Sequence, residues 1–276
     1  MKLVSLSSGS KGNAALVCTE NTKLLVDCGV SGRKANELLK TVGYTLDDID
    51  ALLITHEHSD HIKGVKRLMQ AYDIPVYATG GTLKALADAS RDEYFNYAGR
   101  RLMEEVVLDR YFSIGDIDIL PFRIYHDVAE PCAYRFEAFQ ENAGQMEHKE
   151  AAVLTDCGHF DDMIADHMKL LDAAILEANH DRAMLANGPY PAMLKRRIMS
   201  SDGHLSNNAS GQLLSEIISP KLKNVILGHL SHENNTPEKA LGTVRDELVS
   251  ACGAEAVKML TLSVAPQDSV SNLVII

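Results

Sequence analysis

The chain has 276 residues, of which 46% are hydrophobic and 24% charged, a composition typical of a globular protein with a sizeable core. Its formal net charge of −11 at pH 7 argues against a broad electrostatic footprint on nucleic acid, although an acidic protein can still carry a local basic patch. The first residues lack the continuous apolar core of a signal peptide and no later stretch is apolar for long enough to span a bilayer, so we expect a cytoplasmic protein without a membrane partner.

The predicted elements begin with three short β-type runs, which indicate an antiparallel meander. Helices and strands then alternate, which implies helices packed on the faces of sheets. The strands are expected at 2–6, 14–18, 23–26, 51–55, 75–78, 117–124, 133–139, 150–155, 173–176 and 224–227. The helices are expected at 34–41, 60–72, 82–89, 161–168, 190–199, 208–218 and 237–249, with a loop or short helix over 90–101. No linker-like or low-complexity tract divides the chain, so we expect one domain over residues 1–276.

The most informative motif is His56-x-His58-x-Asp60-His61, which directly follows the apolar run 51–54. If 51–55 is a buried strand, His56 and His58 leave its end on the same side and can bind one ion. Ser59 is then placed to cap the next helix, with Asp60 and His61 in its first turn, where they could hold a second ion. A cluster of this kind predicts a metal or catalytic site rather than solvated loop histidines.

Four more apolar runs end in a residue that can bind a metal: Asp27, His126, Asp156 and His229. Each one alone can be an ordinary polar residue at a strand end. Together they predict convergence at one edge of a sheet, where open α/β folds place their ligands.

This ordered series resembles the metallo-β-lactamase superfamily. The resemblance implies an α/β fold of four layers, an αββα sandwich, with a dinuclear site at one sheet edge. It implies that Asp156 bridges two divalent ions and that Asp27 supports the site from outside through hydrogen bonds. Imidazole and carboxylate ligands suit Zn²⁺, Mn²⁺ or Fe and do not choose among them. By position, the first ion would be bound by His56, His58 and His126, and the second by Asp60, His61 and His229.

The segment 195–208 indicates which kind of substrate atom the nucleophile attacks. Lys195, Arg196 and Arg197 can bind phosphate oxygens, and His204 can protonate a leaving alkoxide. A solvated helix face and a helix-capping loop are the respective alternatives. A histidine at this place in the series looks like the phosphodiesterase branch of the superfamily, which includes tRNase Z and PhnP-type enzymes, and the resemblance implies a proton donor. Glu177 follows a strand and is expected to orient His204.

Six strings, including 7–13, 55–61, 176–181 and 230–237, resemble the YycJ/WalJ family, which is associated with 5′ to 3′ exonuclease activity on DNA. The resemblance implies a nuclease whose nucleophile is a hydroxide shared by two metals, with nucleic acid as substrate. The catalytic candidates are His204, Asp60 and Glu177. The substrate-binding candidates are Ser8, Ser10, Asn13, Lys195, Arg196 and Asn207, with a plain β-turn as the alternative reading of the loop at 8–13.

Two rival functions stay open. One is a small-molecule metallohydrolase that acts on a cyclic phosphodiester or a thioester, and the other is a regulatory protein in which the metals are structural. Aromatic residues are few, and Tyr94, Phe95, Tyr97 and Tyr190 are the candidates for a place near a cleft, although core packing is the favoured interpretation of these four.

Overall fold

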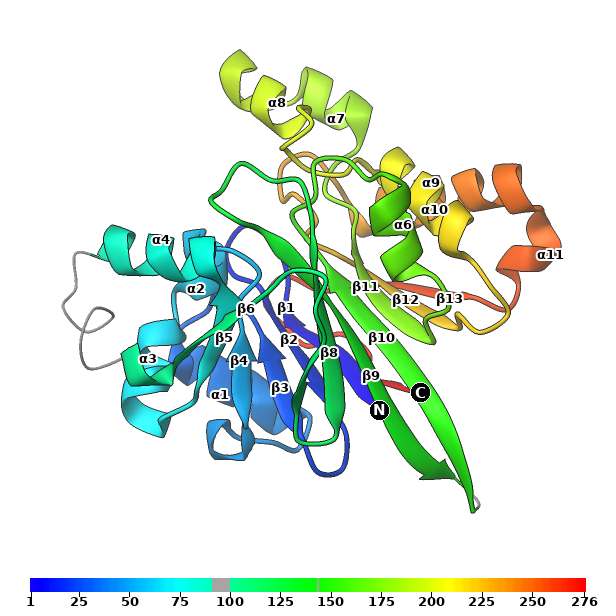
Figure 1. Cartoon of the computed structure of the whole chain (residues 1–276). Coiled ribbons are helices and arrows are strands. Elements are labelled where there is room, and N and C mark those ends of the chain that lie inside the picture. The colour runs from blue at the N-terminus through cyan, green and yellow to red at the C-terminus, as the bar shows by residue number, and fades with distance from the viewer. Residues whose placement is uncertain (91–99, 143) are drawn as a thin grey trace.

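The computed structural model describes residues 1–90, 100–142 and 144–276, and within them two seven-stranded sheets form the centre of the molecule (Figure 1). The first has the order β14-β1-β2-β3-β4-β5-β6 and the second β13-β12-β11-β10-β9-β8-β7. The first sheet contains β1 (Lys2–Ser7), β2 (Ala14–Cys18), β3 (Lys23–Val26), β4 (Ala51–Leu53), β5 (Val76–Thr79), β6 (Met103–Val106) and β14 (Val274–Ile275). The second contains β7 (Phe112–Ile114), β8 (Ile117–Arg123), β9 (Cys132–Asn142), β10 (Gln145–Leu154), β11 (Ala173–Glu177), β12 (Asn224–Gly228) and β13 (Thr261–Val264).

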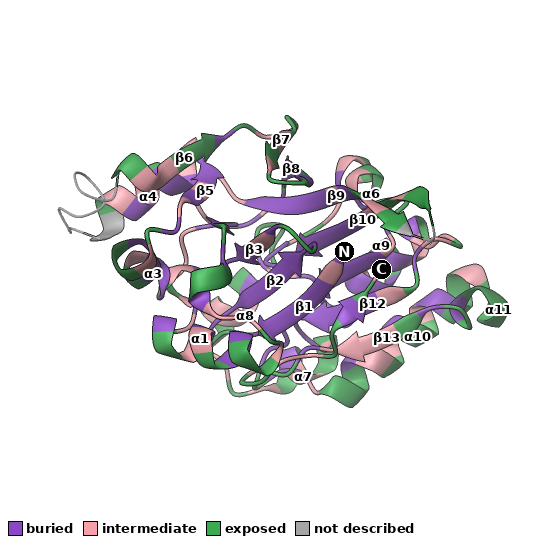
Figure 2. Cartoon of the chain, turned by 90° about the horizontal axis from the view of Figure 1, so that it is seen from below, coloured by how far each residue is buried: buried purple, intermediate pink, exposed green. Residues whose placement is uncertain are grey.

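Apolar side chains form three layers around these sheets. The middle layer lies between the sheets and joins Val17 and Leu53 of the first to Tyr134 and Ile175 of the second. One outer layer packs the first sheet against α1 (Gly32–Thr41), α3 (Val65–Tyr72) and α4 (Gly80–Ser90). The other packs the second sheet against α6 (Asp162–Met168), α9 (Asn207–Ile217) and α10 (Pro237–Cys252). Figure 2 shows the buried strands inside and exposed residues along the helices, so the predicted αββα order is confirmed.

The predicted meander is confirmed, because β1, β2 and β3 pair antiparallel in sequence order. The predicted helix 60–72 is wrong in one respect: it is split into α2 (Ser59–Ile62) and α3. Gly64 lies at the break, where its N–H donates to the carbonyl of Cys28 at 2.7 Å. A Cβ on Gly64 would lie 2.5 Å from Cys28 Sγ, so only glycine allows this close approach.

Ser59 does not cap α2, contrary to expectation. His58 occupies the N-cap with an extended backbone and makes no side-chain cap bond. Its imidazole instead contacts His56 and His126, so the histidine cluster determines how the helix begins.

Several short elements were not predicted, namely α7 (Arg182–Asn187), α11 (Ala254–Val257), β6, β7, β13 and β14. Most are edge strands or single helical turns whose sequences are too short for a periodic pattern. Residues 91–99, with Tyr94, Phe95 and Tyr97, lie outside the described residues. The single domain over 1–276 stays a prediction. No helix in the described ranges is both long enough and apolar enough to cross a membrane.

Candidate metal centre

The candidate site lies where several parallel strands end. β3 pairs parallel with β4 in one sheet, and β10, β11 and β12 pair parallel in the other. Their carboxyl ends therefore meet at one edge of the sandwich. Asp27, Asp156 and His229 each follow a strand and have positive φ values of 60°, 58° and 54°. Such a backbone costs about 1–3 kcal/mol per residue, and strained residues of this kind cluster at functional sites.

The structure brings the seven predicted ligands together in two groups. In the first, His58 Nδ1 lies 3.1 Å from His56 Nε2 and 3.2 Å from His126 Nε2. In the second, Asp60 Oδ2 lies 3.8 Å from His61 Nε2 and 3.7 Å from His229 Nε2.

Asp156 lies between the two groups. One of its oxygens is 3.1 Å from His61 Nε2, and the other is 3.4 Å from His229 Nε2 and 3.9 Å from His126 Nε2. This is the position that a bridging carboxylate would need.

Hydrogen bonds on the far side of three imidazoles fix how the rings face the centre. His61 Nδ1 donates to Asp27 Oδ2 at 2.8 Å, His126 Nδ1 to the Gly203 carbonyl at 3.1 Å, and His229 Nδ1 to Glu177 Oε1 at 2.9 Å. Each Nε2 is thereby turned toward the cluster, as in metal-binding histidines whose other nitrogen is held by a carboxylate or a carbonyl.

Two buried atoms at the centre support a cation there. Asp156 Oδ2 and His229 Nε2 have no hydrogen-bond partner among the described residues. A buried polar atom without a partner is costly, and a metal ion would supply the missing interaction to both. Burial also keeps the pKa of His56 well below its usual value, so this imidazole is neutral, as a ligand must be. The donor set fits a divalent metal.

Burial opposes a charge on His61, but the carboxylates of Asp156 and Asp27 raise its pKa to about 10. A cation that binds Nε2 must therefore displace a proton.

Glu177 organises the other side of the site. It is fully buried, and one oxygen accepts from His204 Nδ1 at 2.8 Å as well as from His229 Nδ1. The second oxygen accepts from the backbone N–H groups of Cys157 and Leu205 at 2.9 and 3.0 Å. Burial opposes its charge, yet His204 and His229 lower the pKa of Glu177 to about 2, so it is a carboxylate at neutral pH.

A cavity of about 330 Å³ opens over both metal-binding groups. Its wall includes His204, which is 19% exposed, and Tyr190. Tyr190 therefore borders the cavity rather than the core. One face of α8 (Ala192–Ile198) contributes Leu194, Arg197 and Ile198, and α7 and α8 lie together over the end of the sandwich opposite the chain ends (Figure 1).

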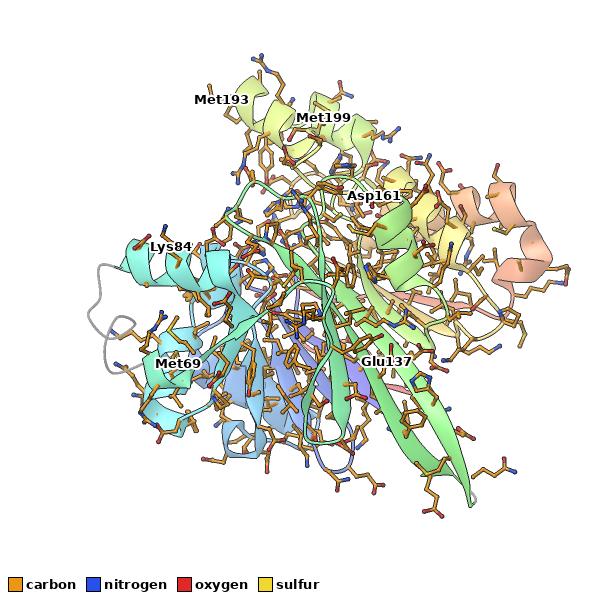
Figure 3. The ribbon with its side chains drawn as sticks, viewed as in Figure 1. Met69, Lys84, Glu137, Asp161, Met193 and Met199 are labelled. Atoms are coloured by element: carbon orange, nitrogen blue, oxygen red, sulfur yellow. The ribbon has the colours of Figure 1, made fainter. Side chains whose placement is uncertain are left out.

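Lys195 and Arg196, two of the three predicted phosphate-binding cations, do not line this cavity. Lys195 is half-buried and contacts the carbonyl of Ala186, and Arg196 is exposed and contacts the carbonyl of Ala192. Met193, also on α8, is 81% exposed and projects away from the sheets (Figure 3).

The cation at the cavity is Arg197, which pairs with Asp127, with Nη2 3.0 Å from Oδ1. Arg197 was predicted as a phosphate-binding cation together with Lys195 and Arg196, whereas Asp127 was not among the predicted site residues. The position of Asp127 beside His126 was the signal that could have found it. The spacing of Leu194, Arg197 and Ile198 on one helix face could have singled out Arg197 among the three cations.

The loop at 8–13 is a β-turn, as in the alternative reading, because Gly12 N–H donates to the Gly9 carbonyl at 2.9 Å. Ser10 lines the cavity. Ser8 is buried and accepts the backbone N–H of His229 at 2.7 Å. Asn13 is buried as well; its N–H donates to the Asp60 carbonyl at 2.8 Å and its amide lies 2.9 Å from His61 Nε2. Ser8 and Asn13 therefore position the metal-binding groups and do not face the cavity.

Asn207, the remaining substrate-binding candidate, is fully buried and does not line the cavity. Its amide exchanges two hydrogen bonds, of 2.9 and 2.8 Å, with the amide of Asn235.

Known proteins are similar to this chain in both sequence and fold. Residues 22–229 match the family model described as "Beta-lactamase superfamily domain". The exodeoxyribonuclease WalJ of Streptococcus pneumoniae is 37% identical over 246 residues, which cover 89% of this chain and 87% of that protein. The exodeoxyribonuclease YycJ of Bacillus anthracis is 36% identical over 251 residues, with coverages of 88% and 87%.

The chain belongs to the WalJ/YycJ family of the metallo-β-lactamase superfamily. Membership of this family, together with the histidine and aspartate clusters, makes it a metal-dependent hydrolase. Among solved structures, the metallo-β-lactamase fold protein YhfI of Bacillus subtilis superposes with a TM-score of 0.65 over 98% of both chains at 18% identity. In this chain the sandwich brings the strand ends of both sheets to the candidate metal centre.

Proposed function

We propose that the protein is a phosphodiesterase that uses two divalent metal ions, Zn, Mn or Fe, and removes nucleotides from DNA in the 5′ to 3′ direction. Its relatives WalJ and YycJ are exodeoxyribonucleases by name, which supports a nucleic acid substrate. The cavity beside the two metal-binding groups supports catalysis over a purely structural use of metal.

The metal-binding roles follow the two geometric groups. His56, His58 and His126 would hold one ion, Asp60, His61 and His229 the other, and Asp156 both. Two divalent ions held by these residues would supply Lewis acidity to the reaction.

Side chains of the protein act on the leaving oxygen, the phosphate and the attacking water. His204 gives its proton to the leaving oxygen, and the ionised Glu177 at 2.8 Å holds the ring and stabilises its charged form. Arg197 presents positive charge to the phosphate from α8. Asp60 lines the cavity next to His229 and is placed to accept a proton from the attacking water.

The observation that carries the proposal is the His204–Glu177 pair on the wall of the metal cavity. A phosphodiester expels an alkoxide, which leaves readily only if it is protonated, so a positioned general acid has a purpose there. A thiolate has a pKa of about 8.5 and leaves without such help, so a thioesterase gains little from this pair.

His204→Ala tests the proposal on two substrates. We expect turnover on single-stranded DNA to fall by about 10²-fold or more, the usual loss when a general acid is removed. Cleavage of bis-p-nitrophenyl phosphate should fall far less, since nitrophenolate departs without protonation. Metal content, measured by elemental analysis, should be unchanged.

His232→Ala is the matched control, because His232 lies on an exposed loop and contacts Glu233. It should leave both activities intact. An equal loss on both substrates in His204→Ala would remove the proton-donor role. Oligonucleotides with one end blocked by phosphorothioates report the direction, and degradation that starts only from the 3′ end would contradict it.

A further inference from the structure

A second cavity, of about 580 Å³, adjoins the metal cavity, and His204 lines both. Its volume is in the usual range for small-molecule sites, roughly 300–1,000 Å³. Its wall is built by the segment before α6, the start of α7, the end of α8 and the N-terminus of α9. The residues that matter for recognition are His159, Phe160, His180, Arg182, His204 and Gln212.

The charge of this cavity suits an anion. The protein has a formal net charge of −11, yet no carboxylate is found among the described residues that line the cavity. Arg182 is exposed, and Nε donates to Ser206 Oγ at 3.2 Å. No Asp or Glu of the described chain lies within ion-pair distance of the Arg182 guanidinium, which leaves it able to bind a phosphate through two parallel hydrogen bonds.

His180 provides an independent sign of a ligand. It is 3% exposed, lines the cavity, and its Nδ1 has no hydrogen-bond partner among the described residues. Burial lowers the pKa of His180 to about 4, so the ring is neutral and offers one donor and one acceptor. Its backbone is fixed, because its carbonyl accepts the N–H of Asn207 at 2.9 Å at the start of α9.

Two aromatic rings that line the same cavity as Arg182 suit a nucleobase. Phe160 is half-buried, and His159 is exposed and stacks on Tyr125 with ring centroids 4.0 Å apart. A base can stack on such rings whatever its sequence. Phosphate and base would thus each find a partner in the same cavity.

We infer that this second cavity binds the 5′-terminal nucleotide of a DNA strand, with Arg182 on its 5′-phosphate. The inference rests on the proposed function. In hydrolysis the oxygen of water becomes part of the new 5′-phosphate, the bond from phosphorus to the 3′-oxygen breaks, and that oxygen takes the proton of His204. The departing nucleotide must therefore lie on the His204 side of the metal centre, where the second cavity is. Recognition of its terminal phosphate would favour cleavage at 5′-phosphorylated ends.

Arg182→Ala tests the cavity, with Arg196→Ala as the control, because Arg196 is an exposed arginine outside both linings. We expect Arg182→Ala to lower kcat/KM on 5′-phosphorylated single-stranded DNA by about 10-fold or more, the usual effect of losing a charge-assisted hydrogen bond. The same DNA with a 5′-hydroxyl, and bis-p-nitrophenyl phosphate, should be cleaved as by the unaltered protein. An equal loss on all three substrates, or no loss on the phosphorylated strand, would overturn the inference.

A binding experiment separates this inference from the proposed function. Thymidine 5′-monophosphate should bind the unaltered protein and Arg196→Ala alike and bind Arg182→Ala at least about 10-fold more weakly in calorimetry, whether or not any DNA is cleaved. Thymidine without the phosphate should bind weakly to all three. If the monophosphate binds the three proteins equally, Arg182 does not contact its phosphate, even if DNA is degraded. If it binds as expected and no phosphodiester is hydrolysed, the proposed function fails and the nucleotide site stands.

Discussion

Buried carboxylates in this protein hold cations and imidazoles in place. Asp27 accepts both the N–H and the hydroxyl of Thr55 as well as His61 Nδ1, so one residue joins the end of β3 to the histidine motif. Glu150, remote from that site, accepts from the guanidinium of Arg135 and the ammonium of Lys221. Burial of such groups is tolerated only when every charge is paired.

Glu150→Gln should reduce stability in a pH-dependent way. Burial opposes the charge, but Lys221 and Arg135 hold the pKa of Glu150 below its ordinary value of 4.5. The carboxylate therefore contributes fully above about pH 4.5, where it is ionised in the unfolded chain too, and the contribution disappears as the pH falls through its lower folded value. We expect Glu150→Gln to lower the free energy of unfolding by about 2 kcal/mol at pH 7, and the difference to shrink below pH 4.5. Thermal melts of both proteins at matched pH measure it, and a gap that widens in acid would contradict the assignment.

The elements meet the site through their ends. β3 and β4 in one sheet, and β10, β11 and β12 in the other, deliver polar residues to the same edge. The loops between them are tied by backbone bonds: Asn13 N–H donates to the Asp60 carbonyl, Cys28 N–H to the His61 carbonyl, and Gly64 N–H to the Cys28 carbonyl. The short helix α2 is thus held by backbone hydrogen bonds to both Asn13 and Cys28, and the helix break at Gly64 provides one of these bonds.

Gly64→Ala should destabilise the protein. The new Cβ would lie 2.5 Å from both Cys28 Sγ and the Val30 carbonyl, so α2 or β3 must shift, at a cost of about 1–3 kcal/mol. Gly242→Ala is the matched control, because it lies inside α10 with nothing within 4 Å of an added Cβ. There the same change should stabilise by about 0.5–1 kcal/mol. Chemical denaturation measures both, and equal midpoints for the two variants would refute the steric explanation.

At the scale of the whole molecule, the candidate metal centre takes its residues from both halves of the sandwich. His56, His58, Asp60 and His61 follow a strand of the first sheet, whereas His126, Asp156 and His229 follow strands of the second. Ions bound between these groups would link the sheets at the edge where apolar packing ends.

Removal of metal should therefore lower the melting temperature of the whole protein. Ligand binding to the folded state adds about 2.7 kcal/mol when the free ligand is 100 times its Kd, which corresponds to roughly 5–10 °C for a chain of this size. Melts before and after treatment with a chelator, with metal content followed by elemental analysis, test this. Recovery of the higher melting temperature on adding Zn²⁺ or Mn²⁺ serves as the control, and an identical melt after complete removal would exclude this link.

The sequence was most informative where periodicity and chemistry coincide. Strand ends marked by Asp27, Asp156 and His229 were located because an apolar run followed by a polar residue is visible along the chain. The partners of Ser8, Asn13 and Asn207 were not, because they come from residues far away in the sequence. A Gly- and Ser-rich loop has the same composition whether it faces a ligand or supports a neighbouring strand. Helical spacing could have identified the cation of α8 that lines the cavity, because it places Arg197 and not Arg196 on the same helix face as Leu194.

One oxygen of Glu177 holds the rings of both His204 and His229, whose centroids are 5.1 Å apart. A thermal displacement of β11 moves the two rings in the same direction, so it cancels in their difference. The distance between the ring of His204, the proposed proton donor, and the ring of His229 is therefore insensitive to vibration of the strand. If the two rings were held by two different residues, they would move independently and the distance between them would vary more.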